Sequence, residues 1–232
     1  MSAQKDKDGN TNKKGSMSPP PDKSNSGPKY LTYEGLIETV GSNTILDTVT
    51  DLEVLFLTFE EICPSTSSGG RVGVTGNNSS LSGSASDSKF PSVFVHLPAL
   101  ERLALLDNGL KHISGLEPVA HTLVKLTICD QMITSIDQGC LNLPNLRQLY
   151  LHRNELTSLK GLSGVPRLQR LWIFQNKLTS LMEVHALPEL NCLWAQANRI
   201  ANLNGLQLCS DLTELCLGKS NTHIYTYTRM HT

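Results

Sequence analysis

Apolar residues recur along most of the chain at intervals of 22 or 23 residues. The clearest copies are LRQLYLHRNELTSL, LQRLWIFQNKLTSL and LNCLWAQANRI. When these are aligned on their asparagine, apolar residues stand eight, five and three positions before it and two positions after it. The aligning column reads, in chain order, Asn108, Gln131, Asn154, Asn176, Asn198 and Ser220. A unit this short cannot bury its own apolar face, so the pattern predicts repeats stacked into a solenoid with a continuous core.

Within each repeat, the apolar residues five and three positions before the asparagine alternate with residues of mixed character. This alternation is typical of a β-strand with one face in the core and one face outward. Successive strands then form a parallel sheet. Prolines ten positions before the aligning residue limit how helical the return to the next strand can be; they are Pro98, Pro144, Pro166 and Pro188. The predicted fold class is an α/β repeat, a solenoid with a parallel concave sheet and short helical, 3-10 or extended convex returns.

The aligning column itself has a structural role in this interpretation. Each strand ends in a turn whose backbone groups have no partner in the sheet, and an inward-facing amide can both donate to them and accept from them. We therefore expect a structural ladder of buried amides at Asn108, Gln131, Asn154, Asn176 and Asn198.

The 22-residue period and the LTSLKGL return resemble the short intracellular class of leucine-rich repeats. That class occurs in the nuclear regulatory subunit of protein phosphatase 1, in axonemal dynein light chain 1 and in tubulin-folding cofactors. The resemblance covers roughly residues 32–220, apart from one inserted stretch. It implies a non-catalytic scaffold for protein–protein interaction, with cytoskeletal or ciliary proteins as the partner class and regulation of a protein phosphatase as the alternative.

Composition divides the rest of the chain. Residues 1–29 are polar and predict a disordered tail, and residues 30–63 predict a capping segment with a helix ended near Gly41 and a degenerate first repeat. In that repeat Leu52, Leu55, Leu57 and Ile62 have the repeat spacing and Glu60 stands in the aligning column. The Ser/Gly-rich residues 64–89 predict a disordered insertion, because removing 26 residues restores the spacing to Asn108. Leucine-rich repeats then fill residues 90–221, and residues 222–232 form an irregular tail.

The end of the last repeat is predicted to be uncapped. The pattern stops after LTELCLGKS, and the residues that follow have no apolar period. Repeat solenoids usually cover their ends with a polar-faced cap. We therefore expect Leu212, Leu215 and Leu217 to be exposed to water.

Charge and cysteine content narrow the functional classes. The formal net charge of −1 gives no general attraction to nucleic acid or to anionic lipid, and no run of 18 apolar residues predicts a membrane span. The six cysteines are scattered rather than clustered at the ends, which favours reduced thiols in the cytoplasm. The cytoskeleton, the cilium and the nucleus stay open as more specific locations.

The outward strand positions carry the candidate binding site. Both tryptophans of the chain and one tyrosine occupy consecutive repeats of one outward column, with arginines around them. Tryptophan, tyrosine and arginine are the residue types that anchor protein interfaces. The predicted partner-binding residues are Tyr150, Trp172, Trp194, Phe174, His152, Arg153 and Arg170. The arginines favour a partner with an acidic surface. The alternative is that the rings only stabilise the sheet by cross-strand stacking.

One group of residues has the composition of a catalytic site. Cys129 and His152 share an outward column on adjacent repeats, with Asp130 beside them, and these are the parts of a cysteine hydrolase. An open sheet face supplies no evident oxyanion hole, so the protein is predicted not to be an enzyme. We expect no metal site, because the sequence holds no CxxC pair, and no cofactor, because it holds no Gly-rich phosphate loop.

Overall fold

The computed structural model describes residues 30–42, 44–55, 57, 59, 62, 92–136 and 141–218, and the backbone of 227–228. The predicted tail 1–29, the predicted insertion 64–89, Glu60, Ser220 and most of the predicted tail 222–232 lie outside these residues. No helix in the described part of the chain is long and apolar enough to cross a membrane.

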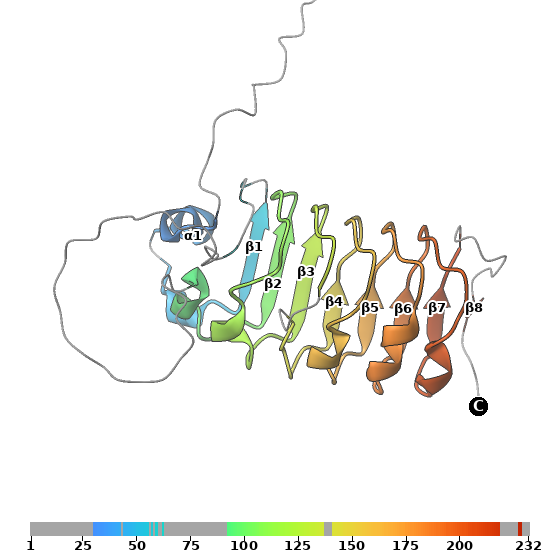
Figure 1. Ribbon diagram of the computed structural model, residues 1–232. Helices are drawn as coiled ribbons and strands as arrows, with labels where there is room; N and C mark the ends of the chain where they lie inside the picture. Colours follow the sequence, from blue (N-terminus) through green and yellow to red (C-terminus); the bar gives the residue numbers. More distant parts are fainter. Residues whose placement is uncertain are drawn as a thin grey trace, which may run out of the picture.

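One sheet runs the length of the molecule, with its strands in sequence order (Figure 1). The strands are β1 (Asp51–Leu55), β2 (Arg102–Leu106), β3 (Lys125–Cys129), β4 (Gln148–Tyr150), β5 (Arg170–Trp172), β6 (Cys192–Trp194), β7 (Glu214–Cys216) and β8 (Tyr227–Thr228). Strands β1 to β7 pair in parallel, and β8 pairs antiparallel with β7. The predicted parallel sheet is confirmed.

The core consists of the inward leucine columns. Leu149, Leu171 and Leu193 lie opposite one another on β4, β5 and β6, and all three are fully buried. The smaller Ala195 is also fully buried in the column three positions before the aligning asparagine. Each leucine therefore packs on its counterpart in the next repeat, which makes the core continuous along the solenoid.

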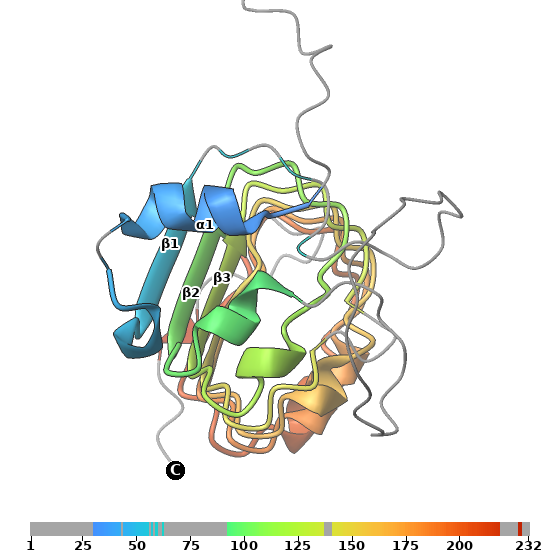
Figure 2. The same ribbon diagram turned by 90° about the vertical axis from the view of Figure 1, so that its left-hand side faces the viewer.

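The returns between strands are short 3-10 helices, as the proline pattern predicts. They are η2 (Val93–His96), η3 (Glu117–Val119), η4 (Leu162–Gly164), η5 (Met182–Ala186) and η6 (Leu206–Leu208), and one more 3-10 helix, η1 (Leu46–Thr48), comes before β1. Viewed along the solenoid, η3 to η6 lie across the core from the sheet (Figure 2). The coils pack tightly here, because a Cβ atom on Gly164 would lie 2.2 Å from the carbonyl oxygen of Leu141.

The N-terminal end of the core is covered by α1 (Tyr33–Val40), which lies across the first coil in Figure 2. Thr32 begins the helix by accepting a hydrogen bond from the backbone N–H of Gly35 at 3.1 Å. Gly41 ends it with a φ of 88°, a conformation that glycine adopts at low cost. Leu36 is fully buried on the inner side of the helix. The predicted helix and its end are confirmed.

The predicted alignment of the first repeat is wrong by three residues. That alignment places Leu55 opposite Leu103, whereas β1 pairs Leu52 with Leu103 and Val54 with Leu105. Leu52 and Val54 are buried, and Leu55 is 43% exposed. The stretch LEVLFL is apolar at positions of both faces, so the repeat spacing fits it in two ways. The burial of Leu52 and Val54 decides between them.

The corrected register also changes the argument for the insertion. Paired residues of β1 and β2 are 51 positions apart, instead of the 48 that separate Glu60 from Asn108. The bounds 64–89 therefore no longer follow from the repeat spacing alone. They rest on composition, and they stay a prediction.

The C-terminal end of the solenoid differs from the expectation of exposed leucines. Leu212 is 5% exposed and Leu217 is 1% exposed, while Leu215 is partly buried. The free edge of β7 is covered by β8, which pairs Thr228 with Glu214. An antiparallel strand satisfies backbone groups that a parallel solenoid would leave open at its last coil.

Candidate protein-binding face

Three aromatic side chains stack across β4, β5 and β6 on the outer face of the sheet. The register places Tyr150 beside Trp172 and Trp172 beside Trp194. The ring centroids of Tyr150 and Trp172 are 4.5 Å apart at 35°, and those of the two tryptophans are 4.5 Å apart at 7°. Tyr150 is only 8% exposed, whereas both tryptophans are partly exposed. The accessible part of this stack is therefore the tryptophan pair.

A second line of rings lies beside the first, two residues further along the strands. His152 stacks on Phe174 with centroids 4.3 Å apart at 13°. Trp172 lies 6.2 Å from the His152 ring and 6.4 Å from the Phe174 ring, so the two lines are in contact. We call the combined surface of Tyr150, His152, Trp172, Phe174 and Trp194 the aromatic platform. It spans three repeats without interruption.

Some polar atoms of the platform have hydrogen-bond partners and others do not. The Tyr150 hydroxyl donates to Gln148 Oε1 at 2.8 Å, and the Trp194 indole N–H donates to the carboxylate of Glu214. The buried Trp172 indole N–H has no nitrogen or oxygen acceptor and interacts with the thiol of Cys192, which is a weak acceptor. Gln196 Oε1 is buried without a hydrogen-bond partner. A buried donor with only a weak acceptor costs free energy. If the rings served only to stabilise the sheet by cross-strand stacking, a side chain without a buried donor would serve as well as tryptophan.

The cations around the platform are not equally available. Arg153 Nε lies 2.7 Å from Asp130 Oδ1, so this predicted edge residue is already paired. Arg170 is exposed at the start of β5. Lys125, which was not predicted as a site residue, places its Nζ 5.2 Å from the centre of the Tyr150 ring. Its place in the same outward column as Arg170 was the signal that could have found it.

Cys129 and His152, the candidate catalytic pair, are in contact. Cys129 Sγ lies 3.2 Å from His152 Nδ1, and the thiol also donates to the carbonyl of Tyr150 at 3.6 Å. Burial raises the pKa of Cys129 to about 12 and lowers the pKa of His152. At neutral pH the thiol therefore keeps its proton. A nucleophilic cysteine needs the opposite, a lowered pKa that yields thiolate, so this geometry does not favour catalysis.

Below the platform, the aligning amides hold the turns together. Asn176 Oδ1 accepts from the N–H of Leu156 at 2.9 Å, and its Nδ2 donates to the carbonyls of Leu151 at 2.9 Å and Ile173 at 3.0 Å. Gln131 joins two N–H groups of the preceding turn through its Oε1. The five predicted ladder residues are all buried; they are Asn108, Gln131, Asn154, Asn176 and Asn198. These bonds fix where each strand ends, and hence where the outer side chains stand.

A feature that sequence reasoning missed lies directly before each ladder residue. The backbone there has a φ between 51° and 58° in five successive repeats, at Asp107, Asp130, Arg153, Gln175 and Ala197. A positive φ is uncommon for residues other than glycine. Only the two aspartates belong to a type enriched in this conformation, so the column has no shared side-chain signature.

The described residues contain no group of three or more histidine, cysteine, aspartate or glutamate side chains placed to hold a metal ion. The four cysteines that the structure describes are free thiols, at Cys129, Cys192, Cys209 and Cys216. Burial raises the pKa of Cys192 to about 11. The outer face in this part of the chain carries large rings and amides, with charged side chains at its edges.

Comparison with known proteins gives the class. Residues 121–178 match the leucine rich repeat family model. The chain is similar to internalin C2 from Listeria monocytogenes strain 4b F2365, with a TM-score of 0.51 and 20% identity over 81% of this chain and 83% of that chain. It is also similar to the functional domain of InlJ from Listeria monocytogenes, with a TM-score of 0.38 and 19% identity over 52% of this chain and 35% of that chain.

A comparison with curated protein sequences gives no significant match. The family match over residues 121–178 and the shared fold show that this chain forms a leucine-rich repeat solenoid. Domains of this type generally mediate protein–protein interactions, for which the solenoid provides an extended surface.

Proposed function

We propose that this protein is a non-catalytic interaction scaffold whose aromatic platform binds a protein partner. The observation that carries the proposal is the uninterrupted stack of rings across β4, β5 and β6, with Trp172 and Trp194 parallel at 4.5 Å and partly exposed. Each large ring can bury about 150 to 250 Å² in a contact. Exposed aromatic surface of this extent on a solenoid is typical of an interface rather than of a free surface.

Cross-strand stacking explains part of this arrangement, since the rings do contact one another. Two observations favour binding in addition. The buried Trp172 N–H has only the weakly accepting Cys192 thiol beside it, and aliphatic β-branched residues would fit the sheet without burying a donor. The rings also occupy only three adjacent repeats, whereas the same outward column holds Ala104 and Thr127 in the repeats before them.

The charges at the edge favour an acidic partner surface next to the platform. Arg170 and Lys125 stand beside Tyr150, and Arg147 is exposed at the neighbouring position of β4. Arg153 contributes less than the sequence predicts, because Asp130 neutralises it. A guanidinium pairs well with a carboxylate in a fixed geometry.

The partner class rests on sequence resemblance. ISGLEP at 113–118 and LEVLFL at 52–57 resemble the N-terminal repeats of leucine-rich repeat-containing protein 9, a long protein of ciliated cells. On that basis the proposed partner is a cytoskeletal or axonemal protein, and the proposed location is the cytoplasm at the cytoskeleton or cilium. A catalytic subunit of a protein phosphatase is the alternative partner, and a nuclear location would accompany it.

Comparative affinity capture tests the proposal. Wild-type protein, the double variant Trp172→Ala/Trp194→Ala and the control Met182→Ala/Leu208→Ala are used as baits in extracts of ciliated cells. Met182 and Leu208 are exposed apolar side chains on the 3-10 helices, away from the sheet. We expect partners that the wild type and the control retain and the aromatic variant loses. Partners retained equally by all three baits would place the binding surface elsewhere.

A further inference from the structure

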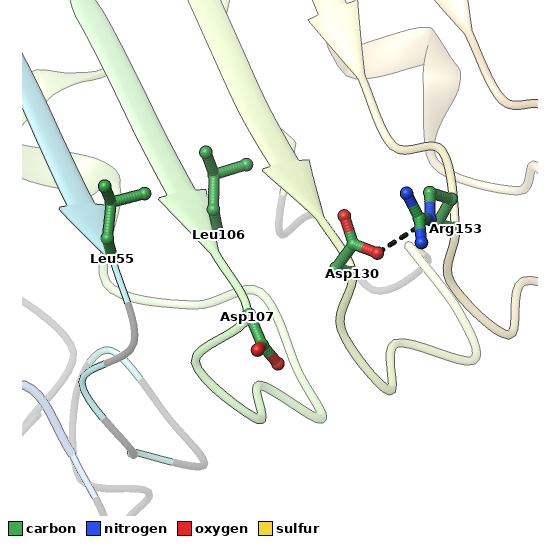
Figure 3. A pocket seen from close by; sticks show the side chains of 5 residues that line it. All are labelled: Leu55, Leu106, Asp107, Asp130 and Arg153. Atoms are coloured by element: carbon green, nitrogen blue, oxygen red, sulfur yellow. Dashed lines mark ion pairs between the residues drawn. The ribbon is translucent and has the colours of Figure 1, made fainter.

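A pocket of about 540 Å³ opens at the ends of β1, β2 and β3, toward the N-terminal end of the sheet. Its lining consists of Leu55, Leu106, Asp107, Asp130 and Arg153 (Figure 3). The two leucine side chains stand side by side at the ends of β1 and β2, and the three charged side chains come from the turns and the strand ends around them (Figure 3). The pocket thus combines an apolar wall with a charged rim.

The rim holds more negative than positive side chains, namely two aspartates and one arginine. Arg153 pairs with Asp130 at 2.7 Å, which uses the one cation of the lining. Asp107 forms no ion pair with another lining residue (Figure 3). Glu53 adds a third carboxylate to Asp107 and Asp130, because it is exposed on β1 two residues before Leu55 and therefore on the same face of the strand. The pocket consequently carries negative charge that its own arginine does not balance.

The apolar wall is continuous with the aromatic platform. Leu55, Leu106 and Cys129 lie opposite one another on successive strands, and Cys129 contacts His152 at 3.2 Å. A chain segment lying across the outer face can therefore contact both regions. Leu55 is 43% exposed although it is a leucine in a strand, so the wall is accessible from the side of the solvent.

We propose that this pocket binds a lysine or arginine side chain of the partner, which extends the proposed function by one specific contact. The aliphatic stem of such a side chain packs on Leu55 and Leu106, and its cation reaches the carboxylate of Asp107. The pocket is open to solvent and larger than one side chain requires, which leaves room for the adjoining backbone. The partner segment therefore carries a basic residue at this end and acidic residues beside the platform.

The test uses small probes, so that it does not depend on knowing the partner. Full-length protein labelled with ¹⁵N is titrated with N-acetyl-lysine methylamide, with N-acetyl-norleucine methylamide, which keeps the aliphatic stem but lacks the ammonium group, and with N-acetyl-glutamate methylamide. The amide signals of Leu106, Asp107 and Asn108 report the pocket. We expect saturable shifts with the lysine probe at millimolar concentrations, as is reasonable for a ligand of this size. The other two probes should bind at least about fivefold more weakly, because they lack the cation.

Two variants assign the binding to the proposed residues. Asp107→Asn keeps the fold because asparagine also adopts a positive φ, and it should weaken the lysine probe at least about fivefold. Asp211→Asn, at an exposed position away from the pocket, should leave the probe unaffected. Equal binding of the lysine and norleucine probes, or an unchanged affinity in Asp107→Asn, would overturn the proposal.

The probe titration tests the pocket independently of the affinity capture that tests the aromatic platform. Trp172→Ala should leave the lysine probe bound, because Trp172 does not line the pocket. If the probe binds as expected while the aromatic variants capture the same proteins as the wild type, the pocket assignment stands and the platform assignment fails. The reverse pattern retains the platform and removes the pocket.

Discussion

The two faces of the same strands follow different rules, and the contrast is sharpest on β5. Leu171 points inward and is fully buried between Leu149 and Leu193, and the same residue type recurs at this position from β2 to β7. Its neighbour Trp172 points outward, and the residues of its column change from repeat to repeat. Stacking of repeats requires the inward pattern. It does not require the outward one, so three consecutive aromatic residues there carry information about function.

The outer face itself has two regions. The aromatic platform on β4 to β6 is flanked by Lys125 and Arg170, and the pocket at the ends of β1 to β3 is flanked by Asp107 and Glu53. A surface with opposite charges at its two ends fixes the direction in which a partner segment lies. The inward residues beneath both regions are buried and apolar, so the difference in charge between the two regions comes from the outer side chains alone.

The largest expected effect of a single substitution is on the inward face. Leu171→Ala removes a fully buried side chain and should lower the free energy of unfolding by about 2 to 5 kcal/mol. The exposed Lys177, which pairs with Glu155 at 3.2 Å, provides the control, because Lys177→Ala should cost at most about 1 kcal/mol. Urea denaturation measures both. Equal losses in the two variants would break the distinction between the faces.

The second effect concerns the amide ladder. Asn176→Ala removes one acceptor and two donor contacts to buried backbone groups, and should cost about 1 to 3 kcal/mol of stability. Asn176→Asp sharpens this test, since a carboxylate can still accept from the N–H of Leu156 but cannot donate to the carbonyls of Leu151 and Ile173. A stability equal to that of the wild type in both variants would show that water replaces these contacts.

A third, smaller effect is expected on the outer face. Trp172→Ala removes the two closest ring contacts, with Tyr150 and Trp194, worth about 0.5 to 1.5 kcal/mol each, and also removes a poorly satisfied indole N–H, so the net cost should be about 1 to 2 kcal/mol. Chemical denaturation of this variant beside Leu171→Ala compares adjacent residues of one strand. A loss as large as that of Leu171→Ala would mean that Trp172 belongs to the core.

The smallest effect is a dependence on pH. Burial lowers the pKa of His152 below that of an unfolded histidine, about 6.5. The unfolded chain therefore binds the proton more readily, and stability falls as pH drops from about 6.5 through the lower pKa of the folded state. His152→Gln should show a smaller decrease in urea midpoint between pH 7 and pH 5 than the wild type. Identical decreases would exclude His152 as the cause.

Much of the architecture could be predicted because it depends on side-chain type at fixed spacing. The strands, the buried leucine columns and the helix ended at Gly41 all follow from such patterns, and the structure confirms them. The first repeat could not be aligned correctly, because its stretch LEVLFL offers apolar residues to both faces. Only packing against the second strand selects Leu52 and Val54 for the core.

The sequence predicts which residues form the candidate site, but it does not predict how all of their side chains pair. The column of Tyr150, Trp172 and Trp194 follows directly from the repeat spacing, and the ring stacking follows from the parallel register. The pairing of Arg153 with Asp130 does not, because it depends on turn conformations with positive φ that have no common residue type. The pocket at the strand ends was missed for the same reason.

The central claim is that the outer aromatic column binds a partner while the inward column maintains the fold. The most direct measurement is the dissociation constant of a purified partner, obtained by affinity capture, for the wild type, Trp172→Ala and Trp194→Ala. We expect each tryptophan variant to bind at least about 30-fold more weakly, equivalent to about 2 kcal/mol, while remaining folded at the measuring temperature. A partner that binds the wild type and both variants with the same dissociation constant would contradict the account.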